Sequence, residues 1–445
     1  IALSSIFGKL LDCIIMADNM EQLSTSELQF GFKCNSSTTQ CTFVLSECVS
    51  YYMSKNTNVN ISFLDATNAF DRVEYIKLFR LLVKRSISPL TIRLLLNMYT
   101  SQTINVVWKN TLSEPFDVSN GVKQGGILSP ILFGIYIDEL MSRLKKSSFG
   151  CHIGHMFVGA LAFADDLALL SPTITGLKRL IDICSEFGKE FNVLFNPSKS
   201  KWLSFPNDDS CHTIKMDGRV IEKVDKYIHL GSCVGADSLS CNVQRCVSKL
   251  YSEVNIIMAQ FGHAFSSIRY KLLQSYATCF YGSQLWDYTS PEIEKLLIAW
   301  RKSVRHIWKL PYRTHNVLLS EICGVSPFEV QLHSRFFKFI HKLNMSENPL
   351  VGLCLKIIHR GSRSPVGRSL NYLLQRYSIR RNHLLNDVSF YNNLCNFKGN
   401  VGHASPEQKA YAVIIRELCE VRDGGMACNL NQTEVLELIE YLCTN

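Results

Sequence analysis

The sequence predicts an α+β fold, in which an antiparallel sheet is backed by helices on one face and a helical region follows. Short apolar-alternating runs typical of strands occur within the first 235 residues, and stretches with a helical period separate them. From about residue 240 onward, only helical periods recur. The order of strand, helix, hairpin, helix and strand along the chain is the order that such a layered arrangement requires.

The elements are placed by their periodicity and by their boundary residues. Residues 1–60 are mainly helical in period, and the first strand ends at Asp65. Ser129 fits the N-cap position, with Pro130 at the first helical position, of a helix that runs to about Lys146. Further helices are predicted over 73–85, 176–191, 249–261, 270–280 and 291–308, hairpins over 104–120 and 161–170, and a strand pair around 201–205.

Length and composition indicate a globular protein of roughly two to four domains. The chain has 445 residues, of which 47% are hydrophobic and 19% are charged, and it contains no low-complexity tract. No uninterrupted apolar run reaches the roughly 18 residues that would suggest a membrane span, so no membrane partner is expected. The N-terminal segment lacks the basic start and the small-residue cleavage site of a signal peptide.

The cysteines indicate a reducing compartment. All 17 are scattered along the chain, without a Cys-x₂-Cys pair or a secretory context. Free and mostly buried thiols are therefore expected, in an intracellular protein of the nucleus or the cytoplasm. No zinc site is predicted, because the cluster of Cys151, His152 and His155 has no second pair of ligands.

Two adjacent aspartates, Asp165 and Asp166, lie between apolar residues on both sides in the run 161–170. Two carboxylates at the tip of a buried hairpin repel each other and lose hydration, so a cation is needed to offset them. A third carboxylate, Asp65, ends a predicted strand about a hundred residues upstream. Three carboxylates on two neighbouring strands are the ligands that a pair of Mg²⁺ ions needs for phosphoryl transfer.

Several segments resemble the motifs of reverse transcriptases, specifically those of the non-LTR (LINE-type) retrotransposon family. They occur in the family's order and with its spacing. In chain order they are LQFGFKCNSSTTQC at 28–41, LDATNAFD at 64–71 (motif A), GVKQGGILSP at 121–130 (motif B), FADD at 163–166 (motif C), FNPSKSKWLSF at 195–205 (motif D) and KYIHLGSCV at 226–234 (the primer-grip motif E).

The resemblance implies a right-hand polymerase with fingers and palm over residues 1–235, a helical thumb over 236–330 and a basic helical region over 331–445. It implies an RNA-directed DNA polymerase that extends a primer 3′-hydroxyl in target-primed reverse transcription. Its partners would be template RNA, a DNA primer and deoxynucleoside triphosphates. The first residues resemble a family segment cut short, so a fragment with incomplete fingers is expected. No endonuclease is recognisable, so nicking would come from absent sequence or from another protein.

The resemblance also assigns roles within the expected active site. Two Mg²⁺ ions, for which Mn²⁺ could substitute, would be held by Asp65 and Asp165, with Asp166 more peripheral and the carbonyl of Ala66 completing one coordination sphere. Lys199 would protonate the leaving pyrophosphate, and an exposed lysine without a catalytic role is the alternative.

Other residues are expected to contact the nucleotide and the primer. Phe70 would lie under the sugar of the incoming nucleotide, where its ring would exclude a 2′-hydroxyl; an ordinary core phenylalanine is the alternative. Gln124 and Gly125 would lie against the incoming nucleotide and the template base pair, because glycine lets the backbone come close to the substrate. The primer terminus would be supported by His229, Leu230 and Gly231.

Positive charge is concentrated toward the C-terminus. Residues 301–400 contain 16 Lys and Arg against 4 Asp and Glu, a balance of +12 in a chain whose net charge is +9. The basic and aromatic run 300–310 has a helical period, which favours contacts with nucleic-acid backbone and stacking by Trp300 and Trp308. A solvated basic helix face is the alternative. The expected contact residues are Arg301, Lys302, Arg305, Lys309 and Arg313.

The sequence leaves two other functions open. The first is a non-catalytic nucleic-acid-binding remnant of a retroelement, and the second is a group II intron-type maturase whose basic helices would bind intron RNA. The intact Asp65, Asp165, Asp166 and Gln124 favour an active polymerase over a remnant. The segments that match motifs D and E favour the retrotransposon branch over a maturase.

Overall fold

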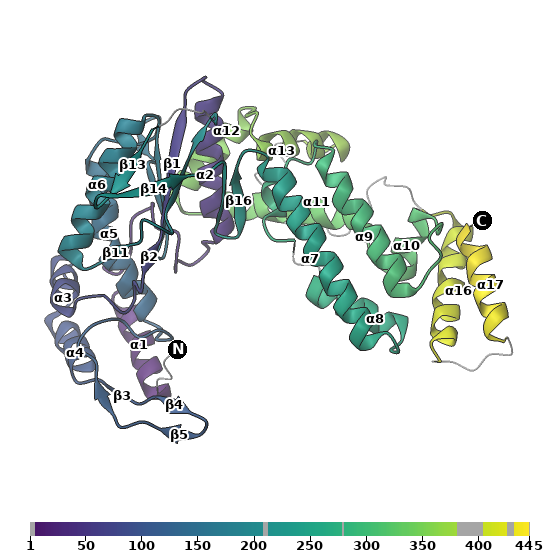
Figure 1. Ribbon diagram of the computed structural model, residues 1–445, viewed down its shortest axis with the longest axis horizontal. Helices are drawn as coiled ribbons and strands as arrows, with labels where there is room; N and C mark the ends of the chain where they lie inside the picture. The colour runs from purple at the N-terminus through teal and green to yellow at the C-terminus, as the bar shows by residue number, and fades with distance from the viewer. Residues whose placement is uncertain (1–4, 208–211, 278–279, 381–403, 425–430, 445) are drawn as a thin grey trace. The chain divides into compact units, whose positions relative to one another are not determined.

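The computed structural model describes residues 5–207, 212–277, 280–380, 404–424 and 431–444, and its elements are labelled in Figure 1. The chain forms two compact units. The sheet unit comprises Ile1–Leu230, Val234–Ala236 and Ser346–Ile357, and the helical unit comprises Gly231–Cys233, Asp237–Met345 and Ile358–Asn445. The mixed content confirms the predicted α+β class.

A six-stranded sheet forms the centre of the sheet unit, with strand order β13-β14-β12-β1-β10-β9. β1 pairs antiparallel with both β10 and β12, but β12 and β14 are parallel. The prediction of a wholly antiparallel sheet is therefore wrong at one pair, because the intervening hairpin of β13 and β14 returns the chain in the direction of β12. The strands are β1 (Val59–Leu64), β9 (Ala160–Phe163), β10 (Asp166–Ser171), β12 (Lys201–Phe205), β13 (Ile214–Met216) and β14 (Arg219–Lys223).

The central strand β1 is covered on both faces, because all six of its residues are buried. The predicted alternation of apolar and polar residues suggested one covered face only. Instead, the two polar side chains donate hydrogen bonds to neighbouring backbone carbonyls: Asn60 to Ser171 at 3.4 Å and Ser62 to Lys201 at 3.5 Å. Because these bonds satisfy their polar groups, Asn60 and Ser62 can be buried in the middle of the sheet.

Helices α2 (Thr38–Met53) and α6 (Ile174–Phe191) pack against β1, and α5 (Ser129–Lys146) packs against α6. The predicted helices over 73–85, 129–146 and 176–191 are confirmed, although Leu128 and not Ser129 is the N-cap of α5. The remaining helices of the sheet unit are α1 (Ile6–Asp18), α3 (Tyr75–Lys84), α4 (Pro89–Thr100) and α12 (Pro349–His359).

Helix α4 was not predicted. Ser88 caps it by accepting a hydrogen bond from the backbone of Thr91 at 3.1 Å, and Pro89 is its first residue. The preceding helix α3 has already ended at Lys84, with Arg85 as its C-cap, so Ser88 and Pro89 mark only the start of α4.

Short strand pairs complete the sheet unit. They are β3 (Thr103–Ile104) with β6 (Phe116–Asp117), β4 (Val107–Trp108) with β5 (Thr111–Leu112), β7 (His152–Ile153) with β8 (Met156–Phe157) and β11 (Leu194–Phe195) with β2 (Ala66–Thr67). A further hairpin of β15 (Lys226–His229) and β16 (Ser232–Gly235) lies where the chain passes from one unit to the other.

The helical unit is built from long amphipathic helices around an aromatic core, in which the rings of Trp300 and Phe328 stack with centroids 4.5 Å apart. The helices predicted over 249–261 and 291–308 are confirmed, and the one predicted over 270–280 ends in a π-helical turn at Leu273–Ala277. The α-helices are α7 (Ser238–Phe261), α8 (Ser266–Leu272), α9 (Glu292–Trp308), α10 (Asn316–Cys323), α11 (Phe328–Asn344), α13 (Pro365–Arg376), α16 (Pro406–Arg422) and α17 (Gln432–Thr444).

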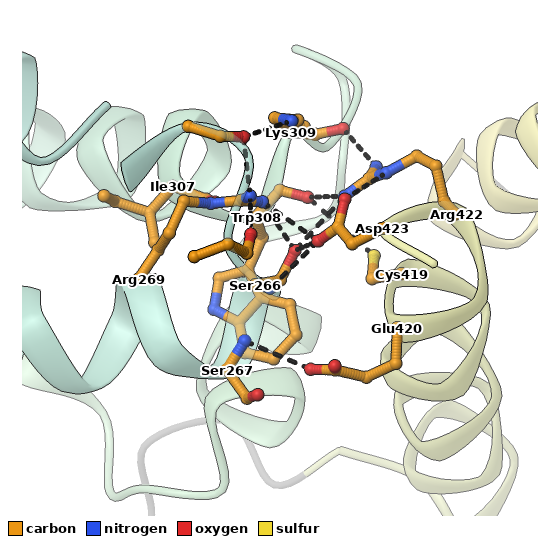
Figure 2. A network of polar contacts seen from close by, with 12 residues as sticks. Ser266, Ser267, Arg269, Ile307, Trp308, Lys309, Cys419, Glu420, Arg422 and Asp423 are labelled. Carbon is orange, nitrogen blue, oxygen red and sulfur yellow. Dashed lines mark hydrogen bonds and ion pairs between the residues drawn. The ribbon is translucent and has the colours of Figure 1, made fainter. Parts of the chain in front are cut away.

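A buried polar network joins α16 to α8 and α9 (Figure 2). Asp423 accepts hydrogen bonds from the backbone N–H and the hydroxyl of Ser266, at 2.9 and 2.6 Å, and pairs with Arg269 at 3.2 Å. Arg422 donates to the carbonyl of Trp308, the last residue of α9, at 2.8 Å. The side chain of Arg269 is fully buried and that of Asp423 is 4% exposed. The start of α8 and the ends of α9 and α16 are therefore held together by charged groups that are almost completely buried.

The described residues also answer the sequence-based expectations about membrane spans and cysteines. None of their helices is long and apolar enough to cross a membrane. Their cysteines are free thiols, and most of them are buried.

Candidate active site

Sheet pairing brings the three predicted carboxylates together. Asp65 directly follows β1, whereas Asp165 lies in the turn between β9 and β10 and Asp166 begins β10. Because β1 and β10 are antiparallel with Leu64 opposite Leu167, the end of β1 lies beside this turn. Two strands far apart in the sequence thus deliver their carboxylates to one edge of the sheet.

The environment of Asp165 and Asp166 opposes the ionisation of their carboxyl groups. Burial raises the pKa of Asp165, and repulsion from Asp65 raises it further, although its own backbone amide lowers it. Burial also raises the pKa of Asp166, with added repulsion from Asp165 and Asp65. Negative charge is therefore held here at a cost in free energy, which is the condition under which a carboxylate cluster favours a cation.

The protein leaves the Asp65 carboxylate poorly satisfied. Its Oδ2 is buried and accepts no hydrogen bond, and the ammonium of Lys199 lies 3.6 Å from it. An acceptor with these properties fits a divalent cation. Within the described residues, however, no group of three His, Cys, Asp or Glu side chains is arranged to hold one ion. A metal here would therefore need ligands beyond the carboxylates, such as a backbone carbonyl, water molecules or substrate oxygens.

The segment after β11 fixes the backbone of Asp65. The Asp65 carbonyl accepts a hydrogen bond from the N–H of Asn196 at 2.8 Å, and the hydroxyl of Ser200 accepts one from the Asp65 N–H at 3.2 Å. Ser200 is fully buried. Sequence reasoning missed these two residues, although both lie within the FNPSKSKWLSF match, where polar residues adjoining a strand were a usable signal.

Ala66 and Lys199 both lie next to Asp65. Ala66 belongs to β2 and pairs with Phe195 of β11, so its peptide is held in register next to Asp65. Lys199 precedes β12, and its side chain is 63% exposed. The structure thus brings Lys199 to Asp65 and leaves its ammonium accessible to a substrate.

Phe70 lies between two other rings. It stacks on Phe133 of α5 with centroids 4.6 Å apart, and the edge of Phe32 meets it at 6.2 Å. Its side chain is only half-buried, so part of the ring is accessible. The geometry accommodates both a sugar platform and a core role for this ring.

The motif B loop closes against the motif A turn. Val122 donates a hydrogen bond to the carbonyl of Phe70 at 2.9 Å, and Gly121 adopts φ +91° where an added Cβ would lie 2.9 Å from the backbone of Asp71. Glycine is therefore required at 121. Gln124 and Gly125 are exposed at the tip of this loop, where they can meet a ligand.

The predicted primer-grip residues form the turn between β15 and β16. His229 is 3% exposed, and its ring packs on Phe63 of β1 with centroids 4.8 Å apart. Burial lowers the pKa of His229 to about 4, so the ring is neutral at physiological pH. Leu230 and Gly231 both have positive φ, at +46° and +77°, which makes the turn tight. His229 thus anchors the turn, and only the next two residues can contact a primer.

The basic run of α9 is partly engaged within the protein. Arg301 pairs with Glu294, Arg305 donates to the carbonyl of Thr314 at 2.7 Å, and Lys309 donates to the carbonyl of Gly262 at 2.9 Å. The exposed cations Lys302 and Arg313 face solvent.

The two tryptophans of this run do not lie on the surface. Trp300 is 6% exposed and Trp308 is 2% exposed. The expectation that they stack on nucleic-acid bases is therefore wrong, because their helical spacing reflects the core-facing side of α9.

Comparison with known proteins identifies the family to which this chain belongs. Residues 1–234, just over half of the chain, match the family described as reverse transcriptase (RNA-dependent DNA polymerase). The chain therefore belongs to the reverse transcriptase family.

Its relatives are polymerases of non-LTR retrotransposons. The RNA-directed DNA polymerase from mobile element jockey of Drosophila melanogaster is 22% identical over 341 residues, which cover 73% of this chain and 36% of the relative. The Retrovirus-related Pol polyprotein from type-2 retrotransposable element R2DM of the same species is 30% identical over 163 residues, which cover 37% of this chain and 14% of the relative. The chain thus spans little more than a third of the longer-matched relative.

Among solved structures, the chain is similar to apo telomerase from Candida Tropicalis, with a TM-score of 0.41 and 13% sequence identity over 83% of this chain and 59% of the other. It is also similar to telomerase from Candida albicans in complex with a fragment of telomeric RNA, with a TM-score of 0.38 and 11% identity over 89% of this chain and 57% of the other.

Proposed function

We propose that this chain is the polymerase part of a non-LTR retrotransposon protein, which adds deoxynucleotides to a primer 3′-hydroxyl on an RNA template. The observation that carries the proposal is the convergence of Asp65 with Asp165 and Asp166 inside the segment that matches the family. On this view residues 1–235 are fingers and palm of a right-hand polymerase, 236–330 the thumb, and 331–445 a basic helical extension. Its biological setting is target-primed reverse transcription, with nicking supplied from outside this chain.

The carboxylates are proposed to hold Mg²⁺, or Mn²⁺ in its place. Asp65 and Asp165 would hold the two ions, with the carbonyl of Ala66 and the more exposed Asp166 contributing at the edge. When bound, the ions supply the positive charge that activates the primer hydroxyl and stabilises the departing pyrophosphate. The raised pKa values of Asp165 and Asp166 imply that protons compete with the ions more strongly than at ordinary aspartates.

The remaining residues position substrates and move a proton. Lys199 is proposed to donate a proton to pyrophosphate, since its exposed ammonium lies 3.6 Å from Asp65. Gln124 and Gly125, at the exposed tip of the motif B loop, are proposed to contact the incoming nucleotide. The turn of His229, Leu230 and Gly231 is proposed to support the primer end.

The direct test of polymerase activity is extension of a labelled DNA primer annealed to a heteropolymeric RNA, with the same primer on a DNA template for comparison. Stepwise extension that requires the nucleotide complementary to each template base is expected. Binding of the primer-template without any extension would instead support the non-catalytic remnant.

Phe70→Ala is expected to lower discrimination against ribonucleotides about tenfold to a hundredfold, because the space beneath the sugar would admit a 2′-hydroxyl. The measurement is the ratio of kcat/KM for a deoxynucleotide to that for the matching ribonucleotide. Phe70→Tyr, which keeps the ring, is the matched control and should retain the ratio. An unchanged ratio in Phe70→Ala would mean that the ring serves only the core formed with Phe133.

Replacing the exposed cations Lys302 and Arg313 together by Gln is expected to weaken binding of RNA and DNA alike. The slope of log K against log salt should become shallower by about two, one for each phosphate that the variant no longer neutralises. Lys295→Gln is the control, because Lys295 lies on the same helix and pairs with Glu292 at 2.6 Å. If the double variant keeps the wild-type slope, these two cations are only solvated surface charges.

A further inference from the structure

A segment near the N-terminus lies along the catalytic hairpin. Residues 28–30 run parallel to β9: the N–H of Phe30 donates to the carbonyl of Ala162 at 2.8 Å, and the N–H of Ala162 donates to the carbonyl of Leu28 at 2.9 Å. This pairing places Gln29 opposite Ala162, two residues before the turn that carries Asp165.

The side chain of Gln29 forms hydrogen bonds with backbone groups of Ala164, in that turn, and of Gly31. Its Oε1 accepts from the N–H of Ala164 at 3.1 Å and from the N–H of Gly31 at 2.9 Å, and its Nε2 donates to the carbonyl of Ala164 at 3.3 Å. Gln29 is 1% exposed. A single buried carboxamide thus satisfies both polar backbone groups of Ala164.

Ala164 needs such support because it is strained. It has φ +59°, a left-handed conformation that L-residues other than Gly, Asn and Asp rarely adopt, and it directly precedes Asp165. The contact is also tight: an added Cβ at Gly31 would lie 2.5 Å from the Ala164 nitrogen, so only glycine fits there. The direction of the Asp165 side chain depends on this one residue keeping its conformation.

The supporting segment is itself bonded to residues of α5. Asp138 accepts from the N–H of Ser26 at 2.8 Å and pairs with Arg85 at 2.5 Å, and Glu27 pairs with Lys145 at 2.6 Å. Because the segment that carries Gln29 is held by α5, it can fix the backbone conformation of Ala164.

We propose that Gln29 is a positioning residue for the catalytic turn: it holds Ala164 in its left-handed conformation and thereby keeps Asp165 facing Asp65. The proposal rests on the proposed polymerase function for its consequence in catalysis, but it makes a separate statement about metal binding. Gln29 itself touches neither substrate nor ion, so it acts only through the turn.

The test compares wild type with Gln29→Met, which keeps the volume and removes all three hydrogen bonds. Binding of Mn²⁺ without nucleic acid, measured by electron paramagnetic resonance, should weaken about 10- to 100-fold, and kcat for nucleotide addition should fall by a similar factor with the nucleotide KM nearly unchanged. Asn60→Leu is the matched control, because it removes a buried amide hydrogen bond to Ser171 at the opposite end of β1. It should leave Mn²⁺ binding unchanged.

Rescue distinguishes positioning from general support of the fold. Glycine adopts the left-handed conformation without help, so Ala164→Gly added to Gln29→Met should restore Mn²⁺ binding to within about threefold of wild type. If Gln29→Met is too unstable to purify, the double variant decides alone: wild-type-like Mn²⁺ binding supports the proposal, whereas failure to fold or to bind overturns it. Wild-type Mn²⁺ affinity in Gln29→Met would overturn it as well.

If wild type binds Mn²⁺ but extends no primer, the proposed polymerase function fails. The positioning role of Gln29 is still decided by Mn²⁺ binding in that case.

Discussion

Asp165→Asn is expected to lower the rate of nucleotide addition by about a thousandfold or more, because it removes one charge from the proposed metal site, and metal ions contribute several kcal/mol to transition-state stabilisation in phosphoryl transfer. The same substitution should not destabilise the metal-free protein and should raise its Tm. Asn keeps the shape of the side chain, and it removes both the burial of a charge and the repulsion with Asp65 that raise the pKa of Asp165.

The pH dependence of this stability difference has a defined sign. A carboxyl whose pKa is higher in the folded than in the unfolded protein destabilises the fold as pH rises from the unfolded pKa to the folded pKa, and the full cost remains above the folded pKa. The Tm advantage of Asp165→Asn in the presence of a chelator should therefore be small near pH 4 and larger at pH 7. Thermal unfolding at the two pH values measures it, and Asp182→Asn, at an exposed position of α6, serves as control. A lower Tm for Asp165→Asn at pH 7 would contradict the electrostatic account of the site.

Asp423→Ala is expected to destabilise the helical unit by about 3–5 kcal/mol, because it leaves Arg269 as an uncompensated buried charge. Asp423 is also the acceptor for the N–H and the hydroxyl of Ser266, at the start of α8. Denaturant unfolding followed by a Trp signal from the helical unit measures the destabilisation. Arg368→Met is the matched control: it removes a partly exposed pair with Asp287 and should cost less than about 1 kcal/mol.

The same network predicts sensitivity to acid. Burial opposes ionisation of Asp423, but the hydrogen bonds from Ser266 and the charges of Arg422 and Arg269 outweigh it and lower the pKa of Asp423. A lowered pKa stabilises the fold above the ordinary pKa of aspartate, and this contribution is lost as pH falls toward the folded value. Asp423→Ala should therefore flatten the acid limb of the stability curve. Equal stability losses for Asp423→Ala and Arg368→Met would contradict the importance of the network.

The sequence predicts those features that depend on local pattern. The strand that ends at Asp65, the Asp165–Asp166 hairpin and the long helices follow from periodicity alone, and the structure has them where they were expected. Helix α4 was not predicted, although Ser88 and Pro89 stand at its start as N-cap and first residue, a pair that commonly begins a helix.

What the sequence could not show are contacts made across long distances in the chain. Gln29 and Ala164 are 135 residues apart, as are Ser200 and Asp65, and no periodicity links either pair.

The exposure of residues within a helix was also misjudged where apolar and basic residues alternate. Trp300 and Trp308 were assigned to a nucleic-acid surface, but the core of the helical unit takes up their rings. Burial of that aromatic area is more favourable than exposure to solvent.

Single-turnover incorporation of one nucleotide opposite each of the four RNA template bases tests whether Asp65 and Asp165 form a template-directed polymerase site. Wild type is expected to incorporate only the complementary deoxynucleotide at each base, and Asp165→Asn is expected to be slower by about a thousandfold. Incorporation that ignores the template base, or that proceeds equally fast in Asp165→Asn, would contradict this assignment.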